Sequence, residues 1–272
     1  MKDKPYKISF RYYFNKKLKP SLEGVVDAQG NEIEKEIYPL YLGVNFRTKT
    51  TLIRSWNDRE EDLFPFDNDI EKLQADAKFS LYLKEEMRFL ENIIRYEVAT
   101  DENNFTLNGL GERYFAYRQS IMSLLDKKMK QILRKEYRSF ARLDELAFDF
   151  SENNIRLSFA KLLRIIRKAS PDFEASEDFR LKVDAYFALA NYLMQNSNYI
   201  KKTDLTQPKS PQQLLEDYLY TIALGYEPSP TVLDWITGKL RQSFSVDNSD
   251  NNSICYVIDE ILTTKKQVLE IA

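Results

Sequence analysis

The spacing of hydrophobic residues changes once along the chain. In Lys7–Leu18 and again in Leu40–Arg47, apolar residues recur at every second position, which is typical of strands with one buried face. Beyond Pro65 they recur every three or four positions, which indicates amphipathic helices. We therefore expect an α+β protein, with a small N-terminal three-stranded antiparallel sheet followed by a mostly α-helical body.

Three strands are expected in the first part. The first lies within Lys7–Leu18, and the second and third flank the turn RTKT, with the third ending near Trp56. The stretch between the first two strands contains Pro20, Gly24 and DAQGNE, which predict turns. The residues expected on the apolar face are Ile8, Phe10, Tyr12, Phe14, Leu40, Leu42, Val44 and Phe46. Those expected on the opposite face are Arg11, Tyr13, Tyr41, Asn45 and Arg47.

Helical spacing continues from about residue 67 to the end. One long helix is expected from about Glu112 to Phe140 and another from near Ser151 to Lys168. The pairs Ser210-Pro211 and Ser229-Pro230 each predict a helix start, with Ser as the cap and Pro in the first helical position. The expected regions are a small antiparallel β domain at 1–66, a basic helical region at 67–170 and an acidic C-terminal helical domain at 171–272.

The net charge of −2 hides a gradient along the chain. Residues 1–57 hold 11 Lys and Arg against 6 Asp and Glu, whereas residues 169–272 hold 9 against 15. Two basic helix faces lie in the middle of the chain. The first comprises Lys127, Lys128, Lys130, Arg134, Lys135, Arg138 and Arg142, and the second Arg156, Lys161, Arg164, Arg167 and Lys168. Each face either tracks a phosphate backbone, remains solvated or pairs with the acidic C-terminal third.

The chain has no His and a single Cys, Cys255. This excludes His-dependent acid–base pairs, Ser-His and Cys-His nucleophile systems, and zinc held by His and Cys. We expect no enzyme activity, no catalytic residues, no metal site and no cofactor. One Cys forms no internal disulfide, and the N-terminal segment lacks an apolar leader, so a cytoplasmic location, or one within a phage particle, is expected. No apolar run is long enough to span a membrane.

A set of basic and aromatic residues in the sheet region is the candidate site. Over roughly Lys7–Tyr117, YPLYLGVNF is followed by the basic turn RTKT, a strand ending in Trp56, a helix and a helical segment broken by an Asn-Phe-Thr loop. This order resembles the N-terminal arm-type DNA-binding domain of Bacteroidetes-type tyrosine recombinases. The resemblance implies a three-stranded sheet whose outer face approaches the DNA major groove. The DNA-binding residues would then be Arg11, Tyr13, Lys16, Lys17, Tyr41, Asn45, Arg47, Lys49 and Arg54.

The chain departs from those recombinases in its chemistry. Their catalytic domain needs an Arg, His, Arg and Tyr constellation, and this chain has no His, so strand exchange is not implied. Two functions remain open. One is a non-catalytic DNA-binding or accessory protein of a mobile element or phage, which contacts duplex DNA. The other is a structural or assembly protein, such as a phage particle component, that binds protein partners or its own copies through interfaces rich in its 17 Tyr and 17 Phe.

Overall fold

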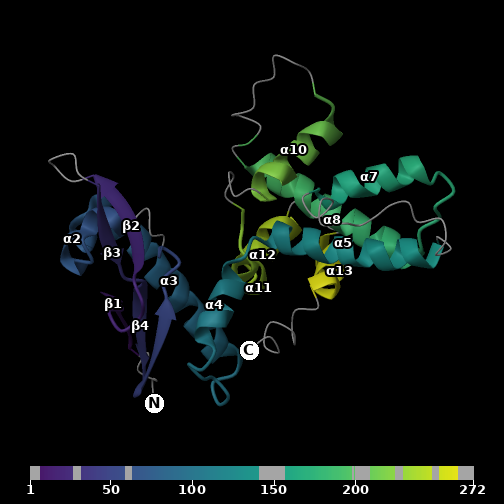
Figure 1. Ribbon diagram of the computed structural model, residues 1–272. Coiled ribbons are helices and arrows are strands. Elements are labelled where there is room, and N and C mark those ends of the chain that lie inside the picture. The colour runs from purple at the N-terminus through teal and green to yellow at the C-terminus, as the bar shows by residue number, and fades with distance from the viewer. Residues whose placement is uncertain are drawn as a thin grey trace. The chain divides into compact units, whose positions relative to one another are not determined.

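The structure is a computed structural model, and it describes residues 7–26, 32–58, 63–140, 157–197, 199, 209–223, 229–246 and 251–262. Contacts between residues divide the chain into two compact units, Met1–Phe115 and Ala116–Ile271. The named strands belong to the first unit, and the second unit is built from helices (Figure 1). The predicted fold class, a three-stranded antiparallel sheet followed by a helical body, is confirmed.

The main sheet of the first unit contains β1 (Ile8–Phe14), β4 (Leu40–Phe46) and β5 (Lys49–Arg54) in the order β1-β4-β5. Both neighbouring pairs are antiparallel. Tyr12, Leu42 and Ile53 lie opposite one another across the three strands and are nearly inaccessible to solvent. The alternation of apolar residues therefore turns one face of the sheet towards the core, with Lys49 exposed at the hairpin end of that face.

The stretch between β1 and β4 is a second hairpin, where the sequence analysis expected turns. β2 (Ser21–Val26) and β3 (Glu32–Ile37) pair with each other as a separate two-stranded sheet. Its strand residues SLEGVV and EIEKEI alternate only weakly between apolar and polar, so hydrophobic periodicity did not predict this hairpin.

Helices cover the apolar face of the main sheet. After the short turn η1 (Phe64–Phe66), α2 (Ile70–Ala75) begins at the cap residue Asp69, and α3 (Ala77–Thr100) begins at Asp76. The hydroxyl of Tyr12 in β1 donates to the main-chain carbonyl of Leu83 in α3. The last helix that begins in this unit is α4 (Leu110–Arg118). It approaches β5 at Gly111, where an added Cβ would lie 3.7 Å from Ile53 Cγ2.

The second unit packs its helices around one large core. Its helices are α5 (Ile121–Phe140), α7 (Phe159–Ala169), α8 (Glu177–Asn196), α10 (Pro211–Ala223), α11 (Val232–Ile236), α12 (Lys239–Val246) and α13 (Asn251–Leu262). Trp235, Tyr186 and Tyr218 are the largest side chains that this core buries fully. The Ser176 cap of α8 and the Ser210 cap of α10 are present, because each hydroxyl accepts a main-chain N–H three residues later.

Three helix boundaries differ from the sequence prediction. The expected helix from Glu112 to Phe140 is interrupted at Ser120, because Ser120 pairs with Thr231 as an isolated antiparallel bridge. That bridge also changes the helix expected to start at Ser229-Pro230. Its cap is Thr231, whose hydroxyl accepts the N–H of Asp234 while the Asp234 carboxylate accepts the N–H of Thr231. The helix expected near Ser151 begins at Phe159, with residues 151–156 outside the described part.

The two units do not coincide with the three regions expected from sequence. The boundary expected at residue 66 falls inside the first unit, because the apolar face of the sheet is covered by α2 and α3. The boundary expected at residue 170 falls inside the second unit, because α5 and α7 share one core with α8 and α13.

Candidate nucleic-acid interface

The side of the main sheet turned away from α3 is called the outer face. Strand register arranges it in three rows, since side chains directly opposite each other point to the same side. The rows are Ser9, Asn45 and Thr50; then Arg11, Gly43 and Leu52; then Tyr13, Tyr41 and Arg54. Arg11, Tyr13, Tyr41, Asn45 and Arg54, all expected from sequence, are thereby brought together.

The centre of the outer face is apolar and aromatic. The rings of Tyr13 and Tyr41 have centroids 6.3 Å apart, and Leu52 beside them is 55% exposed. Partial burial, and then the neighbouring Tyr41, raise the pKa of the Tyr13 hydroxyl, so this group stays a neutral donor at ordinary pH. Gly43 carries no side chain, so Leu52 and Tyr13 close over it; a Cβ there would lie 3.8 Å from Leu52 and 3.9 Å from Tyr13. The centre of the outer face therefore offers both hydroxyl groups and apolar area to a partner.

Cations surround this centre. Arg11 is exposed, and no ion pair involves it in the described residues. Arg54 is 57% exposed and pairs with Asp58, whose carboxylate is nearly buried and also accepts the N–H of Leu40. Lys16 and Lys17 are exposed in the turn that follows β1, at the end of the sheet marked by the Tyr13 row.

The remaining candidate cations, Arg47 and Lys49, lie in or beside the turn between β4 and β5. Arg47, expected on the outer face, lies in the turn with a left-handed φ of 55°. Its guanidinium binds the carboxylate of Glu102 at 2.6 Å and lies over the ring of Phe46. Lys49 is opposite Phe46 and so belongs to the side of the sheet that carries the core residues, although it is exposed. Neither residue is therefore part of the outer face.

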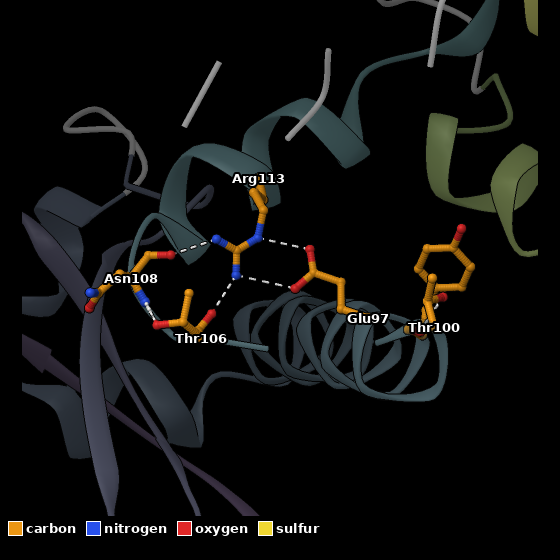
Figure 2. A network of polar contacts seen from close by, with 6 residues as sticks. Glu97, Thr100, Thr106, Asn108 and Arg113 are labelled. Atoms are coloured by element: carbon orange, nitrogen blue, oxygen red, sulfur yellow. Dashed lines mark hydrogen bonds and ion pairs between the residues drawn. The ribbon is translucent and has the colours of Figure 1, made fainter. Parts of the chain in front are cut away.

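The loop that holds Arg47 is fixed by a buried ion pair (Figure 2). Arg113 of α4 is 5% exposed; its Nε lies 2.8 Å from Glu97 Oε1 and its Nη2 3.2 Å from Oε2. The same guanidinium donates to the main-chain carbonyls of Thr106 and Asn108. Because Phe105 of this loop packs on Phe46, the ion pair positions the hairpin turn as well. Sequence reasoning missed this arrangement, since nothing local indicates which acid Arg113 meets.

A buried carboxylate joins the sheet to the helices. Glu86 of α3 is 0% exposed, and no cation pairs with it among the described residues. Its oxygens accept from five groups: the Tyr12, Ser55 and Tyr114 hydroxyls, the Trp56 main-chain N–H and the Asn57 amide. The spacing from Leu83 to Glu86 to Leu90 places a Glu on the buried stripe of α3, and that signal was available in the sequence.

The two basic helix faces lie in the second unit and are partly paired with acids. Lys130 binds Asp126 on α5, and Arg164 of α7 binds Glu216 of α10, an acid from the C-terminal third. Lys127, Lys128, Lys135, Lys161, Arg167 and Lys168 have no ion pair with any described residue. The side chains of Arg138, Arg142 and Arg156 fall outside the described part.

The described ranges contain no group of three or more His, Cys, Asp or Glu side chains able to hold a metal ion. Cys255 is buried in α13. None of the described helices combines the length and the apolar character needed to cross a bilayer. Comparisons with protein-family models, curated proteins and solved structures found no match to this chain.

Proposed function

We propose that the protein binds duplex DNA through the outer face of the β1-β4-β5 sheet, as a non-catalytic accessory protein of a mobile element or phage. The observation that supports this most is the strand register. It gathers Arg11, Arg54 and two tyrosines on one exposed side of a sheet whose other side is buried. The sequence resemblance to arm-type DNA-binding domains assigns the same face to the major groove.

The groups on this face suit distinct parts of DNA. Arg11 and Arg54 on the face, with Lys16 and Lys17 at its end, neutralise phosphates. The hydroxyls and the Asn45 amide supply hydrogen bonds to base edges, and Leu52 supplies apolar contact with thymine methyl groups. A major groove about 12 Å wide admits a ribbon of two strands, which matches the close pairing of β1 with β4.

One observation favours the second function, a structural or assembly protein. Leu52, beside Tyr13 on the outer face, is a large apolar side chain that is 55% exposed, and Trp56, which follows β5 and packs on Phe115, is 39% exposed. Exposed aromatic and aliphatic groups with an adjacent arginine are typical of protein interfaces. In that case the outer face binds a protein partner or a second copy of this chain, and the protein does not act by binding DNA.

A charge reversal distinguishes the two functions. Fluorescence anisotropy with a labelled mixed-sequence duplex measures affinity for the full chain and for Arg11→Glu. The matched control is Arg88→Glu, which makes the same charge change at an exposed site on α3. We expect Arg11→Glu to weaken binding by about tenfold or more and the control to change it far less, because only Arg11 lies on the contact face.

Two results would contradict DNA binding. One is no measurable binding of the wild-type chain at about 50 mM salt, where phosphate contacts are strongest. The other is equal weakening by Arg11→Glu and Arg88→Glu, which would show attraction to overall charge alone. Analytical ultracentrifugation of wild type and Leu52→Ser then tests the assembly function, because loss of a self-associated species in Leu52→Ser would place the interface on the outer face.

A further inference from the structure

A pocket of about 250 Å³ that is partly open to solvent, called the cavity below, lies in the second unit, where α7, α8 and α10 meet. Its described lining falls into two groups. Ala160 and Leu163 of α7 and Phe187 of α8 form an apolar part, while Arg164, Arg167 and Lys168 of α7 and Gln212 of α10 form a polar part. The cavity thus combines three cationic side chains with an apolar wall.

The charges around the cavity are not balanced by the described residues. Arg164 lies 3.1 Å from the carboxylate of Glu216, but Arg167 and Lys168 have no ion pair with a described residue. The three cations and this one acid sum to +2 (three minus one). The helix α7 itself, Phe159–Ala169, contains no Asp or Glu that could offset them. Three like charges held around one hollow favour an anionic occupant.

We propose that this cavity binds a phosphate monoester with an apolar group attached. A monoester carries about −1.5 to −2 at neutral pH, which matches the +2 of the site, whereas a carboxylate or a phosphodiester carries only about half of that. The two guanidinium groups also present the planar pairs of N–H donors that suit phosphate oxygens.

The size and wall of the cavity indicate the second part of the ligand. A water molecule takes about 30 Å³ in the liquid, so the cavity corresponds to roughly eight waters, more than a phosphate group fills. Phe187 is half-buried and so keeps exposed ring surface for a ring or alkyl group, while Leu163 is almost fully buried beneath the cavity. This site lies within the second unit and is independent of the proposed DNA-binding face.

Isothermal titration calorimetry on the full chain tests the proposal with phenyl phosphate as the probe and benzoate as its carboxylate counterpart. The variant is Arg167→Ala/Lys168→Ala, and the matched control is Lys127→Ala/Lys135→Ala, which removes two exposed lysines from α5. Circular dichroism confirms that each variant keeps the helical content of the wild type. We expect phenyl phosphate to bind wild type and control alike and to bind the cavity variant about tenfold or more weakly.

The proposal is overturned if phenyl phosphate fails to bind the wild type, or if both double variants weaken it equally. Benzoate binding as tightly as phenyl phosphate would also overturn it, because charge matching would then play no part. A duplex without terminal phosphates that displaces phenyl phosphate would assign the cavity to backbone phosphodiesters instead, again against the monoester. Failure of DNA binding at the outer face leaves all of these outcomes unchanged.

Discussion

The buried carboxylate of Glu86 allows a sharp test of how the sheet is held on its helices. Glu86→Gln keeps the size of the side chain but turns one acceptor oxygen into an N–H₂ donor. Two of its five partners present an N–H group to it: the Trp56 main chain, 2.7 Å from Oε1, and the Asn57 side-chain amide, 2.9 Å from Oε2. With the Asn57 amide in its present orientation, one N–H group therefore faces another whichever way the new amide is turned.

The magnitude follows from those contacts. A buried donor without an acceptor costs about 1–3 kcal/mol, and the remaining hydrogen bonds lose their charge assistance. We expect Glu86→Gln to lower the free energy of unfolding of the first unit by about 3 kcal/mol. For a unit of this size that is a fall of roughly 10 °C in the unfolding midpoint. The matched control is Glu85→Gln, at an exposed neighbouring site, for which a change within about 0.5 kcal/mol is expected.

Urea denaturation gives the free energies, and hydrogen–deuterium exchange read by mass spectrometry locates the loss. In Glu86→Gln, peptides from β1, from the end of β5 and from α3 should exchange faster, because these segments supply or surround the five donors. Peptides from α8 should be unchanged. An unfolding free energy like that of the Glu85→Gln control, or faster exchange confined to the second unit, would refute the assigned role of Glu86.

Three further predictions concern other parts of the molecule. Arg113→Lys loses the two-pronged contact with Glu97, so the first unit should unfold with about 2 kcal/mol less free energy in urea and residues 101–109 should exchange faster. If Arg11, Arg54, Lys16 and Lys17 each neutralise one phosphate, log K should fall with log salt at a slope of about −3.6, and Lys16→Ala/Lys17→Ala should reduce this to about −1.8. Burial, and then Asp126, hold the pKa of Tyr186 well above its usual 10.0, so only the unfolded chain ionises this group near pH 10. The free energy of unfolding should therefore be unchanged below that pH and fall above it. The fall should be less steep in Tyr186→Phe, which has no hydroxyl to ionise.

Each of these has its own contradicting result. Unchanged exchange at residues 101–109 in Arg113→Lys would show that the loop is held without the ion pair. For the salt slope, the control is Lys84→Ala/Arg88→Ala on exposed positions of α3, and an equal change in slope would remove Lys16 and Lys17 from the interface. For Tyr186, urea denaturation between about pH 9 and pH 11 that falls equally steeply in wild type and Tyr186→Phe would assign the alkaline instability to other groups.

The sequence predicted those parts of the fold that depend on neighbouring residues. Period-two spacing located β1 and β4 and identified which side of each is exposed, because alternation is a local property of a strand; the basic turn after β4 indicated β5. Capping chemistry located the start of α10 for the same reason. The outer face was predictable in composition, since Tyr13, Tyr41 and Asn45 follow directly from that alternation.

What the sequence did not reveal depends on partners far along the chain. The helix expected from Glu112 to Phe140 has no local break signal strong enough to end it, and the interruption at Ser120 comes from Thr231, more than a hundred residues later. Arg47 follows Phe46 in the alternation, but a left-handed turn and Glu102 withdraw it from the face. Periodicity assigns a side to a residue and leaves its ionic partner undetermined.

The two ends of the outer face differ in how far their cations are paired with acids. At the hairpin turn, Arg47 is held by Glu102, and Lys49 lies on the core side of β5. At the opposite end, Arg54 of the Tyr13 row pairs with Asp58, but the adjoining Lys16 and Lys17 have no acidic partner among the described residues. A phosphate backbone is attracted to the cations that acids have not neutralised, so the Lys16 end should contact DNA first. On this argument, changes in the turn act mainly through the stability of the hairpin, whereas changes at the Lys16 end act on affinity.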